Sequence, residues 1–144
     1  MHIFAGTMRF DLPDVWLDNT SYDYKSMDGL LSVQVKRELF DADYVLDSLA
    51  EERINVFREG MPKATSTPTM KTKLGKYEAR QGDIAFPDAD GKDSIMRLIL
   101  AQPANSVLIA LYATGPATRR GELEKIIDAL VKSFTLEGDN RVRS

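Results

Sequence analysis

The chain contains no cysteine and only one histidine among its 144 residues. The lack of cysteine excludes disulfides, thiolate nucleophiles and cysteine-ligated zinc within this sequence. The single histidine is His2, which leaves no histidine elsewhere for a catalytic triad or a general base. There is also no glycine-rich phosphate loop and no histidine-containing metal signature. We therefore expect a protein that is not an enzyme and that uses neither a cofactor nor a metal.

Long hydrophobic runs are absent as well. No stretch approaches the about 18 consecutive apolar residues of a membrane-spanning helix, and the first residues lack the basic and apolar regions of a signal peptide. The formal net charge of −3 argues against nucleic-acid binding. We interpret the one basic cluster, Lys71, Lys73 and Lys76, as the exposed face of a strand. We expect a cytoplasmic protein that binds no nucleic acid and does not itself insert into a membrane.

The acidic residues give the one remaining suggestion of chemistry. The segment from Asp88 to Asp93 resembles the opening of a calcium-binding loop, but the twelfth position counted from Asp88 is Ile99 rather than glutamate. We therefore interpret this segment as a solvated hairpin loop. An enzyme that uses Asp83, Asp88 and Asp93 stays as an alternative hypothesis, although nothing in the sequence points to paired catalytic carboxylates.

Two adjacent segments, 94–101 and 106–113, are apolar at both even and odd positions. Because successive side chains of a strand point to opposite faces, these segments predict two strands that are buried on both faces of a sheet. The short link 102–105 makes them antiparallel neighbours.

The remaining pattern predicts one α+β domain, with a mainly antiparallel β-sheet and two long helices. We expect the domain to span 1–137 and a flexible tail to span 138–144. The other expected strands are 8–12, 21–25, 30–39, 69–74 and 76–86, the last interrupted or bulged near Gln81 and Gly82.

Two amphipathic stripes predict the helices. The first helix is expected to begin at a cap residue, Asp41 or Asp43, and to end near Gly60, and the second runs from Pro116 to about Phe134. Arg53 projects from the middle of the first stripe. It either extends its charged head to the edge of the interface or pairs with a buried group, and we favour the first arrangement.

Two helices do not cover both faces of the expected sheet. A large apolar patch on a soluble protein usually marks an interaction surface. In the absence of catalytic groups, the extra apolar strand surface favours a binding module.

A set of diffuse motifs resembles a known family. In order along the chain these are Leu12-Pro13-Asp14-Val15-Trp16, a strand through Tyr22 and Tyr24, a helix start at Asp41-Ala42-Asp43-Tyr44-Val45, a strand-rich middle and an amphipathic helix that ends near Phe134. Over about residues 2 to 136 this order is similar to the DcrB-related proteins of the PsbP-like fold. More narrowly, it resembles the Eag chaperones of type VI secretion systems.

The resemblance implies a PsbP-like α/β/α sandwich that forms a homodimer in the cytoplasm. Such chaperones bind and shield the N-terminal transmembrane helices of a secreted effector, often of the Rhs type. They hold the effector until it is loaded on the secretion spike protein. The expected partners are therefore an effector's transmembrane region, the spike protein and a second copy of the chain.

Carried over by position, the resemblance also implies the residues of a concave cradle for the partner. The strand residues of this cradle would be Tyr22, Tyr24, Ser32, Gln34, Lys36, Ser94, Met96 and Leu98. The flanking helix residues would be Ser48, Glu52 and Val56. Two alternatives stay open: Tyr22, Tyr24, Met96 and Leu98 pack beneath the chain's own C-terminal helix, or the same sheet face carries a small molecule or lipid.

Overall fold

The described part of the chain folds around one large sheet. The computed structural model describes residues 2–5, 8–11, 16–17 and 21–136, and side chains over 22–134. The predicted tail 138–144 and the expected turn at 12–15 lie outside the described residues. Within the described ranges, no helix combines the length and apolar character needed to cross a membrane.

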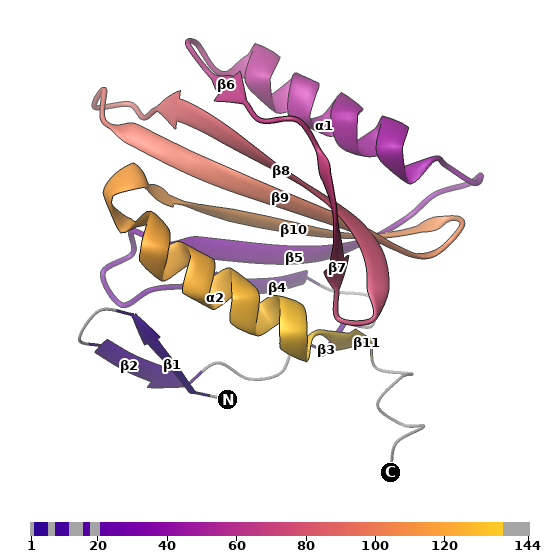
Figure 1. Cartoon of the computed structure of the whole chain (residues 1–144), viewed down its shortest axis with the longest axis horizontal. Coiled ribbons are helices and arrows are strands. Elements are labelled where there is room, and N and C mark those ends of the chain that lie inside the picture. Colours follow the sequence, from indigo (N-terminus) through magenta and orange to yellow (C-terminus); the bar gives the residue numbers. More distant parts are fainter. Residues whose placement is uncertain (1, 6–7, 12–15, 18–20, 137–144) are drawn as a thin grey trace.

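Seven strands form the central sheet in the order β4-β5-β10-β9-β8-β6, and β7 also pairs with β8 (Figure 1). All of these strand pairs are antiparallel. The strands are β4 (Ser21–Lys25), β5 (Ser32–Leu39), β6 (Thr65–Ser66), β7 (Met70–Leu74), β8 (Tyr77–Pro87), β9 (Asp93–Ala104) and β10 (Val107–Pro116).

Two small sheets lie outside this large one. β1 (His2–Ala5) and β2 (Met8–Asp11) form an antiparallel pair, and β3 (Trp16–Leu17) runs parallel to β11 (Thr135–Leu136). Strands β1, β3, β6 and β11 have two to four residues each and were not predicted. Such short segments carry too little alternation to be distinguished from loops.

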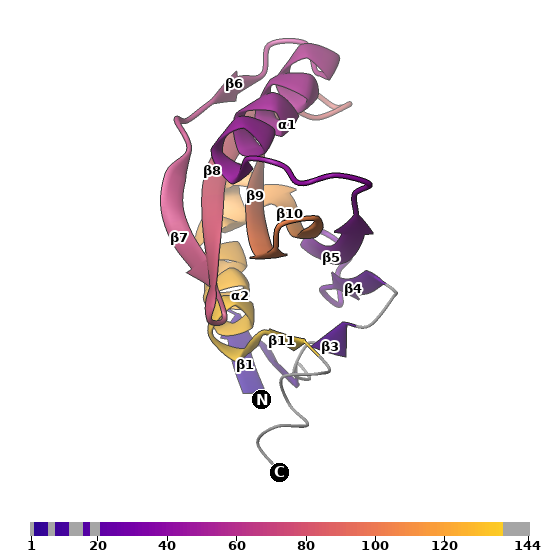
Figure 2. The ribbon, with the colours of Figure 1, turned by 90° about the vertical axis from the view of Figure 1, so that its right-hand side faces the viewer.

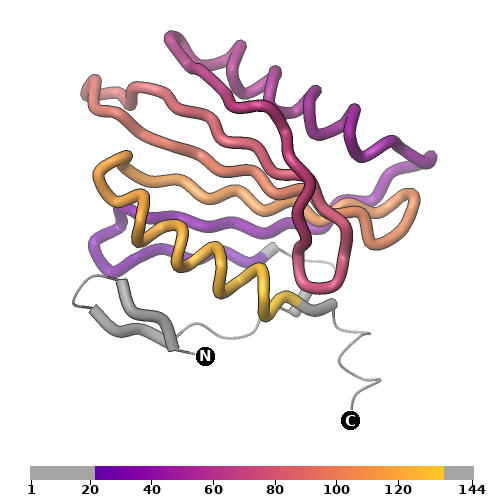
Figure 3. Tube along the Cα trace, viewed as in Figure 1, coloured from indigo at the N-terminus to yellow at the C-terminus, as the bar shows by residue number. Residues whose placement is uncertain are grey.

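One helix lies on each face of the large sheet. α1 (Leu46–Gly60) lies above the sheet in Figure 2 and α2 (Arg120–Ser133), which follows a 3-10 turn (Ala117–Arg119), lies below it. The three layers confirm the predicted α+β fold with a mainly antiparallel sheet and two long helices. The tube in Figure 3 shows how the chain passes from β5 across one end of the sheet to reach α1.

β9 and β10 are buried on both faces, as their apolar sequences predicted. Residues 98–101 and 108–111 are each at most 1% exposed. Alternate side chains serve different helices: Ile99 and Leu111 pack in the core that includes α2, whereas Leu98 and Leu100 pack in the clusters that include α1.

The start of α1 differs from the expectation. The helix begins at Leu46, and the preceding Val45 has extended backbone and makes no side-chain cap hydrogen bond. Neither Asp41 nor Asp43 therefore caps it. Instead, the Tyr44 hydroxyl donates to the carbonyl oxygen of Val107 at 2.6 Å, so a tertiary contact fixes the approach to the helix.

The expected bulge near Gln81 and Gly82 is absent from β8. Its pairing with β9 is continuous from Ala79 to Pro87. On the other side, β8 changes partner from β7 to β6 just beyond Gly82. A Cβ atom at this glycine would overlap the Ile54 side chain, so Gly82 serves the close approach of α1 rather than a bulge.

Candidate functional site: a groove between α1 and β5

α1 covers only part of its face of the sheet. Its buried residue Ile54 packs with Ile84 of β8 and Leu98 of β9. In Figure 2 the helix lies toward the β8 side, away from β5 and β4. A groove therefore remains on the same face, along the side of α1 that faces β5.

The groove consists of two neighbouring pockets that share lining residues. The first, of about 540 Å³, is lined by Phe40, Leu49, Glu52, Arg53, Val56, Phe57 and Tyr112. The second, of about 300 Å³, is lined by Ser32, Gln34, Lys36, Phe57, Met96, Tyr112 and Thr114. Because Phe57 and Tyr112 line both parts, we describe them together as the groove.

Strand register decides which side chains form the floor of the groove. Gln34 of β5 lies opposite Tyr112 of β10, and Thr114 lies opposite Met96 of β9. Directly paired residues share one face of a sheet. The even-numbered residues of β5 therefore face the groove, while Val33 and Val35 face α2.

Two ring contacts shape the walls. The rings of Phe57 and Tyr112 lie 5.7 Å apart at 58°, and those of Phe40 and Tyr44 lie 4.9 Å apart at 54°. Such tilted pairs are a favoured aromatic geometry. Burial raises the pKa of Tyr44 to about 12, so its hydroxyl stays protonated at neutral pH and continues to donate.

An ion pair joins α1 to β5 beside the groove, between Arg53, which lines the groove, and Glu38, which is not among the lining residues. Arg53 donates from Nη1 to Glu38 Oε2 at 2.6 Å and from Nη2 to Glu38 Oε1 at 2.7 Å, and Nη1 also donates to the Tyr112 hydroxyl at 2.9 Å. The two charged side chains are 21% and 32% exposed. Hydrogen bonding to Arg53 lowers the pKa of Glu38 below its ordinary value of 4.5. The favoured expectation, that Arg53 extends its charged head to the edge of the interface, is therefore incomplete: the head keeps some contact with water but pairs with the partly exposed Glu38.

Six of the residues expected in the cradle line the groove. They are Ser32, Gln34, Lys36, Glu52, Val56 and Met96. Ser94 shares the face of Met96 but lies beyond the lining residues, and Ser48 is exposed on α1 outside the lining. Lys36 and Glu52 are both exposed, which places these charges at the open side of the groove.

Three other expected cradle residues lie elsewhere. Tyr22 and Tyr24 lie opposite Val35 and Val33 and pack against the α2 core, on the reverse face of the sheet. Leu98 lies on the groove face of the sheet but is only 1% exposed, because α1 covers it. Tyr22 and Tyr24 were assigned to the wrong face because the β4–β5 register was unknown. Leu98 was assigned to the cradle because the position of α1 over β9 was unknown.

Several lining residues were not predicted. These are Phe40, Leu49, Arg53, Phe57, Tyr112 and Thr114. Tyr112 and Thr114 follow from the β5–β10 register once β5 is placed, because they pair with Gln34 and Ser32. Nothing in the sequence assigns the helix residues, since Leu49 and Phe57 belong to the same apolar stripe as the buried core residues.

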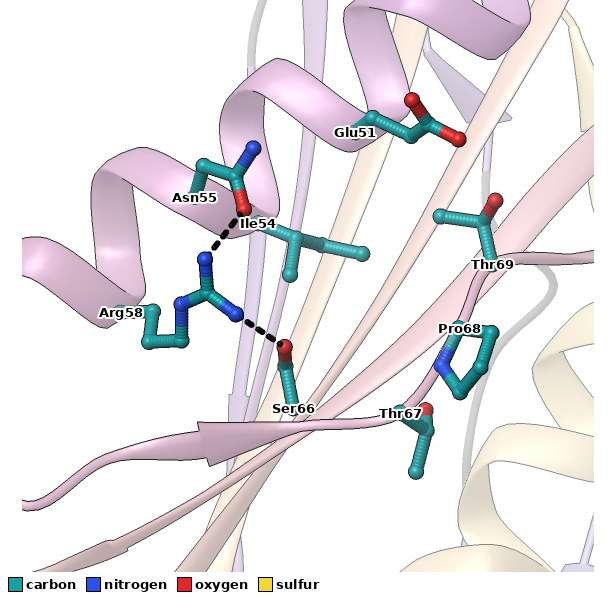
Figure 4. A pocket seen from close by; sticks show the side chains of 8 residues that line it. All are labelled: Glu51, Ile54, Asn55, Arg58, Ser66, Thr67, Pro68 and Thr69. Atoms are coloured by element: carbon teal, nitrogen blue, oxygen red, sulfur yellow. Dashed lines mark hydrogen bonds between the residues drawn. The ribbon is translucent and has the colours of Figure 1, made fainter.

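The opposite flank of α1 holds a second pocket of about 460 Å³, shown in Figure 4. Its lining is mainly polar. Arg58 donates to the Asn55 side chain at 2.9 Å and to the Ser66 hydroxyl at 3.4 Å. α1 is thus bordered by a polar pocket on one side and by the largely apolar groove on the other.

Two of the three acidic residues of the enzyme hypothesis are held by other contacts. Asp83 is held by Arg97, at 2.8 and 3.0 Å, and by Arg120 at 3.1 Å. Asp88 accepts hydrogen bonds from the backbone of Asp90 and Lys92 within its own hairpin loop. In the part of the chain that the structure describes, no group of three or more His, Asp or Glu residues is placed to hold a metal ion.

Comparisons with known proteins bear on the fold alone. No protein-family model matches the chain, and no curated protein matches it. A solved structure is similar over 94% of this chain and 95% of its own, with a TM-score of 0.66 and 12% identity. It is that of PA94 from Pseudomonas aeruginosa, a protein of unknown function described as a proposed regulator. At this identity the likeness supports a shared fold and assigns no activity.

Proposed function

We propose that the chain is a cytoplasmic chaperone that binds and shields the N-terminal transmembrane helices of a type VI secretion effector. The observation that carries this proposal is the groove, where the face beside α1 is left open by the chain's own helices. Val56 is 63% exposed at its edge, and Phe40, Leu49 and Phe57 are only partly buried. A partner helix would cover these side chains.

α1, which forms one side of the groove, is shorter than a membrane-spanning helix, so one groove covers only part of such a helix. α1 has 15 residues and is therefore about 22 Å long, whereas a membrane-spanning helix of about 20 residues measures about 30 Å. Burying its apolar surface contributes about 25 cal/mol per Å². One groove covers one side of such a helix, so the proposal includes a homodimer whose second copy covers the rest.

The exposed charges fit the margins of this arrangement. Lys36 and Glu52 lie at the open side, where they contact the polar ends of an occupant while keeping access to water. The spike protein is the expected receiver of the loaded effector. The likeness to Eag chaperones supports these partners.

Co-expression tests the proposal. The full chain is produced with the N-terminal, transmembrane-helix-containing fragment of the effector encoded nearest its gene, and the soluble fraction and co-purification are measured. We expect the fragment to be soluble only with the chain. Val56→Asp places a charge at the groove and should abolish co-purification, whereas the control Asn55→Asp places the same charge on the other flank of α1.

Failure of the wild-type chain to solubilise or retain the fragment counts against the proposal. Equal retention by the Val56→Asp and Asn55→Asp variants would instead show that the fragment binds another surface. The alternative function, a small-molecule or lipid carrier, draws on the groove volume, which falls within the range of ligand pockets. Native mass spectrometry of the freshly purified chain would detect such a cargo.

A further inference from the structure

Arg53 lies among mainly apolar side chains in the larger part of the groove, where Glu52 is the other charged lining residue, and it pairs with Glu38 of β5. Both side chains still retain some contact with water. An occupant that covers them removes this water, and desolvating a charged pair is costly unless its remaining hydrogen-bonding capacity is met. The pair therefore makes the groove sensitive to what the occupant presents at this point.

The unused hydrogen-bonding groups can be identified. Arginine carries five N–H donors, and the three hydrogen bonds to Glu38 and Tyr112 leave the Nε–H and one Nη2–H without a partner among the described residues. The Tyr112 oxygen accepts from Arg53, so its own hydrogen is left to donate. Each Glu38 oxygen accepts one hydrogen bond from Arg53 and has further lone pairs. Donors and acceptors thus occur side by side.

We propose that this cluster recognises a neutral polar side chain, best a carboxamide of Asn or Gln, within the apolar segment that occupies the groove. This inference rests on the proposed function. The amide oxygen would accept from Tyr112 or Arg53, and the amide N–H would donate to Glu38. A hydroxyl matches the same groups less completely, while an aliphatic side chain leaves them desolvated and unpaired.

The position of the cluster allows it to decide how an occupant is aligned along the groove. Arg53 and Tyr112 both line the larger part of the groove, and Tyr112 also lines the smaller part. A carboxamide fixed at this point sets which turns of the occupant meet Phe40 and Leu49 and which meet Ser32 and Thr114. Tyr112 and Arg53 are therefore assigned as specificity-determining residues.

The test uses two designed apolar helices of about 20 residues, fused to one soluble carrier protein and differing only in a central Asn or Leu. Dissociation constants are measured for the full chain. The double variant Glu38→Met with Arg53→Met removes both charges and should shift the Leu-to-Asn affinity ratio about tenfold toward the Leu helix. Tyr112→Phe, which removes only the hydroxyl, should shift it in the same direction by about threefold.

Arg58→Met, in the polar pocket beyond α1, is the control and should leave the ratio unchanged. Circular dichroism and the unfolding midpoint confirm that each variant is folded. If both helices bind the wild-type chain but the ratio stays constant across the variants, the inference is overturned and the proposed function stands. If neither helix binds the wild-type chain, both are overturned.

Discussion

The two faces of the sheet differ in how far a single helix covers them. Beneath α2, side chains of β5, β9 and β10 join Leu123, Ile126 and Leu130 in a continuous core. On the other face, α1 is displaced toward β8 and β9 and leaves Tyr112 and Met96 partly open. Both faces therefore contribute buried core, and the α1 face in addition carries the groove.

The largest effect is expected in the closed face. Leu111 is fully buried in the α2 core, so Leu111→Ala should lower the free energy of unfolding by about 2–5 kcal/mol through lost burial and a cavity. Urea denaturation followed by circular dichroism measures it. Met27→Ala, at a side chain that is 83% exposed, is the control and should change it by less than about 0.5 kcal/mol. Similar losses in the two variants would remove the basis for calling this face the core.

The attachment of α1 is expected to be the next most sensitive feature. Gly82→Ala adds a Cβ atom that overlaps Ile54, and we expect a loss of about 1–3 kcal/mol in unfolding free energy. Ile54→Val shortens the side chain that is hit, so the double variant should recover part of this loss. If the double variant instead loses the sum of the two single-variant losses, the close contact between helix and strand is contradicted.

The ion pair between Arg53 and Glu38 is expected to contribute less to the free energy of unfolding than these packing contacts. Arg53→Met leaves Glu38 without its partner and should cost about 1–2 kcal/mol, whereas Glu38→Met with Arg53→Met should cost less than the single change. The folded-state pKa of Glu38 is lowered, so its contribution is present above the ordinary value of 4.5 and is lost as the pH falls below it. Urea midpoints from pH 7 to about pH 3 should therefore converge for the wild type and the double variant.

The smallest stability effect is expected at the open edge. Val56 is 63% exposed, so Val56→Asp should change the free energy of unfolding by no more than about 0.5 kcal/mol, although the same change should abolish binding of the occupant. Thermal unfolding measures this. A large loss of stability would mean that Val56 belongs to the core rather than to the groove.

Much of the fold could be predicted from the sequence because apolar periodicity reports directly on burial. The unbroken apolar runs of β9 and β10 predicted that both strands are buried on both faces. The amphipathic stripe of residues 123–134 predicted α2. The first helix was predicted, but its first residue was not. An aspartate can favour a helix start only where the backbone geometry permits it. Tyr44, bound to the β9–β10 region, decides that geometry through a contact distant in sequence.

The candidate site was predicted less completely, because a site depends on register and on helix position. Ser32, Gln34 and Lys36 were placed on one face by simple alternation, and the structure agrees. Tyr22 and Tyr24 alternate equally well, but their face depends on how β4 aligns with β5. Arg53 could be recognised as exceptional, yet its partner Glu38 lies 15 positions away on a strand whose register was unknown.

The absence of a side chain at position 82 has an effect beyond its own strand. Because α1 settles directly on β8 at this glycine, the contact that seats the helix on the sheet lies outside the lining of the groove. A larger residue at this one buried position would displace α1 and so reshape the groove without altering any side chain that lines it.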